Sequence, residues 1–241
     1  MGKPTVVCSS RPSSNRDRWS LIVPCQSGGL LHTSATDSTR YYNSVPRIST
    51  EWQSVDRLAT DLGIISAVSV TEVQTPTNSF GDCKTELVAA CISVGQLKIA
   101  QGPFHCGGSP SRWKWEGKTS AKILRPGEVT GNPVVITDYG SDKTRLDLLV
   151  PSAEGGIFHF ISTQSTPDDW HMIGRVAFPQ NIPPASCLSF HSQPKSWDKL
   201  RSFYALVQIH GRLYYVKTTS DVFPWYDARL DPIVRPGSFF K

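Results

Sequence analysis

Four hairpin-like stretches recur along this chain of 241 residues, with starts roughly 60 residues apart. Each joins an apolar run, a turn that contains glycine, and a second run with an aromatic or basic residue at a matching place. They are Leu21–Ser34, Leu87–Gln101, Leu146–Ser162 and Tyr204–Thr218. Self-similarity at such a period, with several strands in each unit, is the signature of a repeat architecture.

Two further segments accompany every hairpin. A short run of small and β-branched residues precedes it, and a segment that opens on aromatic residues and closes on aliphatic ones follows it. The preceding runs are Pro4–Ser10, Ile65–Val73, Asn132–Tyr139 and Ala185–Ser192, and the following ones are Arg40–Ile48, Arg112–Leu124, Asp169–Phe178 and Pro224–Val234. The pattern predicts an all-β fold, a β-propeller of about four four-stranded blades.

The predicted blades are residues 4–50, 60–125, 129–180 and 183–235, within one domain that spans residues 1–241. No clasp that would close a four-bladed ring is evident, so the chain could also form part of a larger ring or a homodimer that pools its blades. Between the first two blades, Glu51–Leu62 has apolar residues at helical spacing and predicts an inserted amphipathic helix.

Charge, targeting signals and cysteines narrow the functional class. The net charge is +5, but the basic residues are scattered, which argues against a nucleic-acid partner. No apolar run reaches the roughly 20 residues that cross a bilayer, and no signal peptide is evident, so we expect a cytoplasmic protein without a membrane partner. The six cysteines form no CxxC pair and no metal-ligand spacing, so free thiols, no metal and no cofactor are expected.

The third unit resembles the tryptophan-rich, lectin-type propellers of fungi and bacteria. It carries NPVVITDYG, then RLDLLVPSAEGGIFHF, then DDWHMIG, which follow the small-residue strand, the "RLDVFV"-like strand, the "ALYHxW"-like strand and the closing tryptophan segment of those repeats. The other units match more loosely. The resemblance implies blade construction, and families of this kind include fucose-binding lectins and enzymes of fungal secondary metabolism.

One polar column runs through the hairpins. Aligned on their turn glycines, the third strands place His32, Lys98, His159 and Tyr214 at one position, on one face of each sheet. Such a column would line equivalent pockets, or its members would simply pack between blades and satisfy one hydrogen bond each.

Aromatic residues on the fourth strands are the second candidate ligand set. A flat aromatic ring suits the C–H face of a sugar, and a nearby charged group would bind the hydroxyls. The aromatic candidates are Trp113, Trp115, Trp170 and Trp225, with Arg112 as a polar partner. Packing between blades is the simpler role for these rings.

Catalytic motifs are missing from the sequence: it has no nucleophile elbow, phosphate loop or metalloprotease helix. The third unit holds several carboxylates, including Asp138, Asp147 and Glu154, but a glycosidase needs two at a defined separation. An enzyme would most naturally use the inner strands at the central channel, where Glu72, Asp138, Tyr139 and His191 are the candidates.

The leading functional hypothesis is lectin-like binding of a carbohydrate, or of another polar or hydrophobic small molecule. A propeller enzyme of secondary metabolism, of the cyclase, pericyclase, lyase or isomerase type, is the alternative, and a protein-interaction scaffold is a third. Lectins repeat their pocket residues from blade to blade, whereas an enzyme has one asymmetric site. Here the column is only partly repeated.

Overall fold

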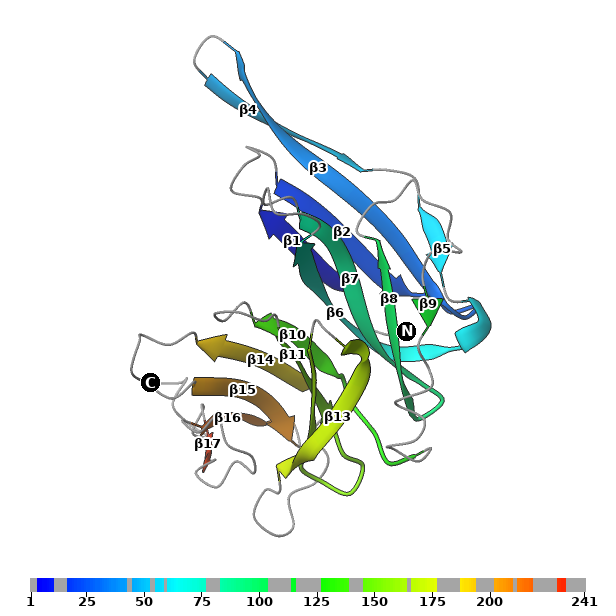
Figure 1. Ribbon diagram of the computed structural model, residues 1–241, viewed down its shortest axis with the longest axis vertical. Coiled ribbons are helices and arrows are strands. Elements are labelled where there is room, and N and C mark those ends of the chain that lie inside the picture. The colour runs from blue at the N-terminus through cyan, green and yellow to red at the C-terminus, as the bar shows by residue number, and fades with distance from the viewer. Residues whose placement is uncertain are drawn as a thin grey trace, which may run out of the picture. The chain divides into compact units, whose positions relative to one another are not determined.

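A computed structural model shows a chain made almost entirely of β-strands (Figure 1). It describes residues 4–10, 17–42, 45–52, 55–58, 60–76, 83–103, 114–115, 127–138, 145–163, 166–176, 187–193, 202–209, 212–218 and 229–232. The chain forms two compact units: an N-terminal unit of Met1–Val94 with Ile99–Glu116, and a C-terminal unit of Gly95–Lys98 with Gly117–Lys241. Each unit is described by itself.

Two sheets build the N-terminal unit. The first has the order β1-β2-β3-β4, with β5 also paired to β3, and the second has the order β6-β7-β8-β9. The strands of the first sheet are β1 (Thr5–Ser10), β2 (Asp17–Pro24), β3 (Leu30–Tyr42), β4 (Val45–Trp52) and β5 (Asp56–Leu58). Those of the second are β6 (Ile65–Pro76), β7 (Cys83–Ser93), β8 (Gln96–Pro103) and β9 (Lys114–Trp115).

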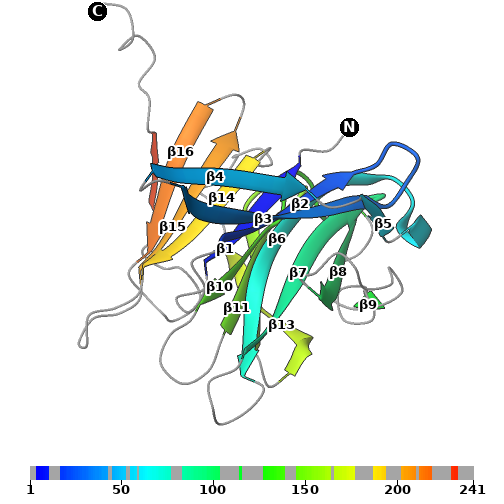
Figure 2. The same cartoon turned by 90° about the horizontal axis from the view of Figure 1, so that it is seen from above.

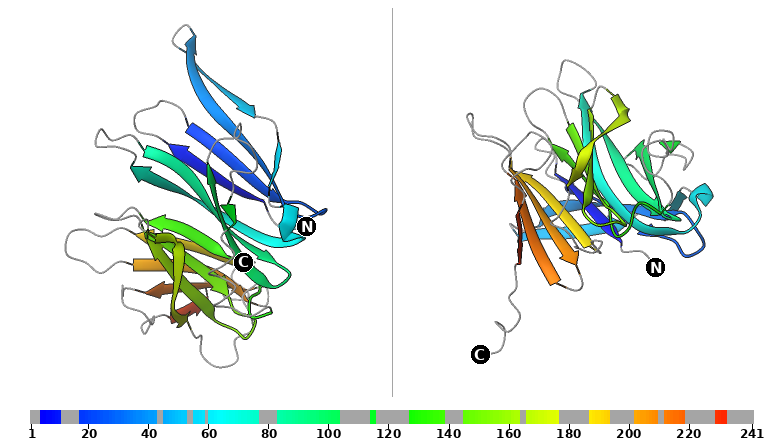
Figure 3. Two further views of the ribbon diagram at one scale, coloured as in Figure 1. Left: turned by 45° about the vertical axis from the view of Figure 1, so that its right-hand side comes forward. Right: turned by 90° about the horizontal axis from the view of Figure 1, so that it is seen from below.

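Two four-stranded sheets build the C-terminal unit, again in chain order. The third sheet contains β10 (Val134–Asp138), β11 (Arg145–Pro151), β12 (Ile157–Thr163) and β13 (Thr166–Val176). The fourth, yellow to red in Figure 3, contains β14 (Cys187–Gln193), β15 (Ser202–Ile209), β16 (Arg212–Thr218) and β17 (Arg229–Pro232). The prediction of an all-β fold is confirmed by four antiparallel sheets, of which the first has a fifth strand that was not predicted.

The predicted helix over Glu51–Leu62 is wrong. Trp52 pairs with Ala35 at the end of β4, and Leu58 of β5 pairs with Leu30, so both segments add to the same edge of β3. A short 3-10 turn, η1 (Thr60–Leu62), follows. The long β3 edge offers backbone hydrogen bonds along its whole length, and these outweigh a weak helical periodicity.

The core of the N-terminal unit lies between its two sheets. Ile22 and Leu30 of the first sheet join Val68, Leu87 and others of the second in one buried cluster. Their strands touch where β1 and β2 lie beside β6, as Figures 1 and 2 show. The hydroxyl of Thr5 adds a hydrogen bond of 2.8 Å to the carbonyl oxygen of Val68. Burying one such aliphatic side chain contributes about 1.5–3 kcal/mol.

Central strands differ in how many of their faces are buried. Along β7 every residue from Leu87 to Ser93 is buried, and so is every residue of β11 from Leu146 to Pro151. On β15, by contrast, Ala205 and Val207 are buried whereas Leu206 is 41% exposed. Because side chains alternate between faces, β7 and β11 are covered on both sides and β15 on one.

Glycines in two hairpin turns contact the segment that precedes the first strand of the next sheet. The amide of Gly29 donates to the carbonyl oxygen of Gly63, 2.9 Å away, just before β6. A Cβ added to Gly28 would lie 3.2 Å from the same oxygen. At the second hairpin the roles are reversed: the amide of the linker residue Gly127 donates to the carbonyl oxygen of the turn residue Gly95 at 3.0 Å. At Gly28 and Gly95 the neighbouring backbone lies so close that an added Cβ would be crowded, at 3.2 Å and 3.1 Å respectively.

Alanine substitutions at Gly28 and Gly63 distinguish backbone strain from steric crowding at the contact between the first hairpin turn and Gly63. Gly28 and Gly63 both have positive φ, +91° and +67°, but a Cβ at Gly63 would meet no atom within 4 Å. Gly63→Ala should lower the free energy of unfolding by about 1–2 kcal/mol, the cost of a left-handed L-residue. Gly28→Ala should cost more, since the Gly63 backbone must also move. Urea unfolding measures both, and equal losses would contradict the contact.

Candidate functional site

A charged side chain lies at the centre of the third sheet. Asp147 has no exposed surface, and it stands on β11 between apolar residues that are also buried. Its cross-strand neighbour on β12 is Ile161, and Leu149 on the same face is opposite His159. An ionised carboxylate in such a place must be compensated by hydrogen bonds or by opposite charge.

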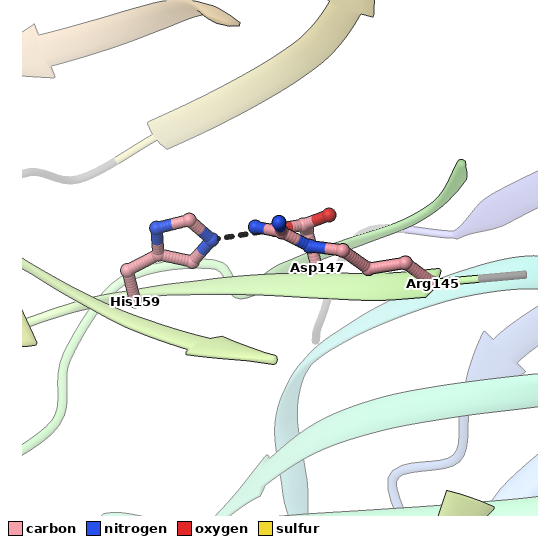
Figure 4. A network of polar contacts seen from close by, with 3 residues as sticks. All are labelled: Arg145, Asp147 and His159. Atoms are coloured by element: carbon pink, nitrogen blue, oxygen red, sulfur yellow. Dashed lines mark hydrogen bonds and ion pairs between the residues drawn. The ribbon is translucent and has the colours of Figure 1, made fainter. Parts of the chain in front are cut away.

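Arg145 and His159 provide that compensation at a single oxygen (Figure 4). Arg145 donates to Asp147 Oδ1 from Nη2 at 2.6 Å and from Nε at 3.2 Å. His159 Nε2 lies 2.7 Å from the same oxygen. Because an ionised carboxylate only accepts hydrogen bonds, Nε2 carries the proton and donates. The contact runs diagonally across β11 and β12, a distance that long side chains can span.

The other carboxylate oxygen is not compensated. Asp147 Oδ2 is buried, and among the described residues it alone is a buried side-chain nitrogen or oxygen without a hydrogen-bond partner. Leaving a buried acceptor unsatisfied costs about 1–3 kcal/mol, and more when the group is charged. Arg145 extends from this buried place toward the solvent, since its side chain is 23% exposed. Oδ2 itself is buried, so its capacity to accept a further hydrogen bond is not used by any described residue.

Opposing effects set the ionisation of Asp147. Burial raises the pKa of its carboxyl, whereas the hydrogen bond from His159 and the positive charge of Arg145 lower it, and the net result is a pKa below the ordinary value of 3.8. Asp147 is thus an anion at neutral pH. A neutral side chain at position 147 would lack this negative charge.

A neutral counterpart exists in the first sheet. Ser20 Oγ on β2 lies 2.5 Å from His32 Nε2 on β3, and both residues are buried. His32 is directly opposite Ile22, so this contact also crosses the strand pair diagonally. The two pairs have one geometry, with a hydroxyl in the first sheet where the third has a carboxylate.

The hairpins that carry the two pairs correspond residue by residue. Residues 18–36 match residues 145–163 at one constant offset in residue number, including strand register and turn length. Identical residues are Arg18 and Arg145, Leu21 and Leu148, Val23 and Val150, Pro24 and Pro151, Gly28 and Gly155, Gly29 and Gly156, His32 and His159, and Thr36 and Thr163. These two units are more alike than the general repeat of the chain indicates.

Four of the ligand-binding candidates from the sequence have described side chains. His32 and His159 are 2% and 1% exposed, Trp170 is 4% exposed, and Tyr214 is half-buried. The structure brings His159 together with Arg145 and Asp147, and His32 together with Ser20. A role of these residues in binding stays a prediction.

The remaining candidates are only partly described. Glu72 is a buried residue of β6, 8% exposed. Asp138, His191 and Trp115 lie in strands β10, β14 and β9, but their side chains fall outside the description. Tyr139, Arg112, Trp113 and Trp225 lie outside the described residues.

Arg145 was missed by the sequence reasoning, and Asp147 was noted only as one of several carboxylates. The signal was present as an Arg-x-Asp spacing on a strand, which places both side chains on one face. A histidine after the following turn completes the set. Only the cross-strand register shows that this histidine reaches the aspartate.

Neither a metal cluster nor a membrane span is found in the described part of the chain. No group of three or more His, Cys, Asp and Glu side chains there could hold a metal ion. No helix among those residues is long and apolar enough to cross a bilayer.

Comparison with known proteins does not define a family for this chain. No family model and no curated protein matches the sequence. Among solved structures, the chain is similar to a GH62 hydrolase in complex with xylotriose, with 12% sequence identity and a TM-score of 0.47. The similarity covers 95% of this chain and 67% of that one.

Two cysteines have opposite environments. Cys25 lies in the first hairpin turn, where its Sγ is 3.1 Å from Ser27 Oγ. Hydrogen bonds with Ser27, together with the charge of Arg57, lower its pKa against a small opposing effect of burial. Cys91 is fully buried in β7, and burial alone raises its pKa well above the ordinary value.

Thiol labelling should therefore separate these two residues. We expect iodoacetamide at pH 7.5 to alkylate Cys25 in the folded protein, because the thiolate is the reactive form. Cys91 should react only after denaturation. Peptide mass spectrometry resolves the sites, and Cys25→Ser is the matched control. Labelling of Cys91 at the rate of Cys25 in native protein would contradict the described burial.

Acid should weaken the network around Asp147. Because its folded pKa is lowered, the carboxylate contributes stability at pH values above the unfolded pKa, and this contribution is lost as pH falls through the folded pKa. We expect Asp147→Asn to lower the free energy of unfolding by about 1.5–3 kcal/mol at pH 7. The difference from wild type should shrink below pH 3.8. Urea unfolding at several pH values measures it, and a pH-independent difference would count against an ionised Asp147.

Proposed function

We propose that the protein binds a carbohydrate, or a small ligand of comparable hydroxyl content, in the manner of a lectin. The observation that carries this proposal is the unpartnered Oδ2 of Asp147. A folded protein retains a buried acceptor without a partner chiefly where function uses it, because an apolar or neutral residue would be more stable there. A sugar hydroxyl is a suitable donor, since it can also accept a hydrogen bond.

Arg145 supplies a hydrogen-bond donor for the same ligand. Its guanidinium is held by two hydrogen bonds to Asp147, and part of its side chain reaches solvent. A hydroxyl that donates to Asp147 meets a cationic donor beside it, so one ligand group can make both kinds of contact.

The architecture that suits this function is a propeller. We take the four sheets as blades of one domain over residues 1–241, related to the lectin-type propellers that the third unit resembles. In support, each repeat forms an antiparallel sheet in chain order, and the first strands of neighbouring sheets lie together within each unit, β1 with β6 and β10 with β14. Closure of the ring is part of the proposal.

Binding of simple sugars tests the function. Titration calorimetry with L-fucose, D-galactose, D-mannose, D-glucose and D-xylose should detect millimolar or tighter binding of at least one. Asp147→Asn should weaken that binding about 10- to 100-fold, the effect of losing a hydrogen bond to a charged group.

Glu154→Gln is the matched control, because it removes one negative charge from the exposed turn of the same hairpin. Its affinity should stay within about twofold of wild type, as expected for a charge outside the contact. No binding of any of the five sugars would refute the proposal. Equal loss in both variants would show a general effect of charge instead of a contact with Asp147.

A further inference from the structure

We infer that one face of the first sheet binds a linear oligosaccharide across the row of Trp19, Ala35 and Trp52, so that the two indole rings stack on two different sugars of one chain. The site uses residues of the first sheet alone and does not depend on any role of Asp147. It goes beyond the proposed function by assigning a second site, on the surface, and the length of ligand that this site takes.

Strand register places the two tryptophans in one row. Trp19 on β2 is paired with Ala35 on β3, and Ala35 is paired in turn with Trp52 on β4. Paired residues of antiparallel strands project from the same face of a sheet, so both indole rings rise from one face with only an alanine between them.

The spacing of the row sets the length of the ligand. Neighbouring strands lie about 4.8 Å apart, so the two tryptophan positions are separated by about 10 Å. A single pyranose ring cannot cover two aromatic rings at that separation, whereas two sugars of one oligosaccharide can. Because both tryptophans stand on strands of one sheet, their separation is fixed before the ligand binds, which lowers the entropic cost of binding.

Burial distinguishes this face from the opposite one. On the opposite face Ser20 and Ile22 have no exposed surface, whereas on this face Trp52 is 51% exposed and Trp19 is half-buried. Ala35 is only 2% exposed, as expected for a small side chain that is flanked by two large rings. The other side chains of described exposure on this face are all exposed or half-buried: Val6, Leu21, Val23, Leu31, Thr33 and Arg57.

The corresponding face of the third sheet is closed, since Leu146, Leu148 and Phe160 are at most 1% exposed. By the correspondence of residues 18–36 with residues 145–163, the first sheet has Trp19 at the position of Leu146. It has Thr33 at the position of Phe160. A hydroxyl in place of a phenyl ring suits a hydrated surface, and tryptophan combines an apolar body with a polar N–H group. These two differences favour a polar ligand over a tightly packed protein surface.

Sugars have the chemistry that this face requires. The C–H bonds on one side of a pyranose ring form an apolar surface that a flat aromatic ring can cover, while the hydroxyls stay in water or bind polar groups nearby. A row of two separated rings repeats that contact along the chain of sugars. The second contact adds to the affinity of the first because both belong to one ligand.

Substitution of Trp52 tests the inference. Titration calorimetry compares cellotriose, xylotriose and chitotriose with glucose, xylose and N-acetylglucosamine. We expect at least one trisaccharide to bind about 10-fold more tightly than its monosaccharide. Trp52→Ala should remove this preference, and Trp52→Phe, which keeps an aromatic ring, should retain most of it. Leu206→Ala is the control, because it removes an exposed apolar side chain from the fourth sheet and should leave each affinity within about twofold.

The outcomes separate this site from the one proposed at Asp147. Asp147→Asn should leave the trisaccharide preference unchanged, whatever its effect on monosaccharides. A wild type without the preference, or a Trp52→Ala variant that keeps it, would overturn the inference and leave the proposal for Asp147 intact. Light scattering tests for a protein on this face: a wild-type dimer that Trp52→Ala converts to a monomer would assign the face to a second copy of the chain instead. If circular dichroism shows that Trp52→Ala is unfolded, Trp52→Leu, which keeps an apolar side chain without a ring, decides in its place.

Discussion

Burial of both faces of a central strand is the constraint on which this structure depends. From Leu87 to Ser93 on β7 and from Leu146 to Pro151 on β11 every side chain is buried, so each must be apolar or must find its partners inside the protein. Most positions obey the first condition with Leu, Val, Ala or Ile. Asp147 obeys the second, and its network with Arg145 and His159 is the consequence.

That network also shows how a repeat protein can change one site and keep its framework. In the first sheet the same diagonal position holds the hydroxyl of Ser20, which lies against the His32 ring. Replacing a hydroxyl by a carboxylate adds a charge, for which Arg145 compensates, and an additional acceptor, for which the described residues offer no partner. Leaving that acceptor without a partner has an energetic cost.

Hairpin turns form backbone hydrogen bonds with linker segments. The amide of Gly29 donates to the carbonyl oxygen of Gly63, and the amide of Gly127 donates to that of Gly95. In the third hairpin, Ala153 donates to the carbonyl oxygen of Glu128 at 2.8 Å. These bonds involve only the main chain, which is why they recur although the surrounding side chains differ.

The alternation of apolar residues and the turn glycines were sufficient to predict the four hairpins, because strand periodicity and positive φ are local properties. The flanking strand predicted over Arg40–Ile48 was wrong, since β3 extends to Tyr42 and β4 begins at Val45. The same local reasoning failed at Glu51–Leu62, where pairing with β3 outweighs helical spacing. It also placed His32 and His159 in one column but assigned neither a partner. The pairing of each histidine with a residue on the neighbouring strand, and the buried second oxygen of Asp147, were decided only by the tertiary structure. Cross-strand register and burial depend on residues distant in sequence, so local sequence patterns could not determine them.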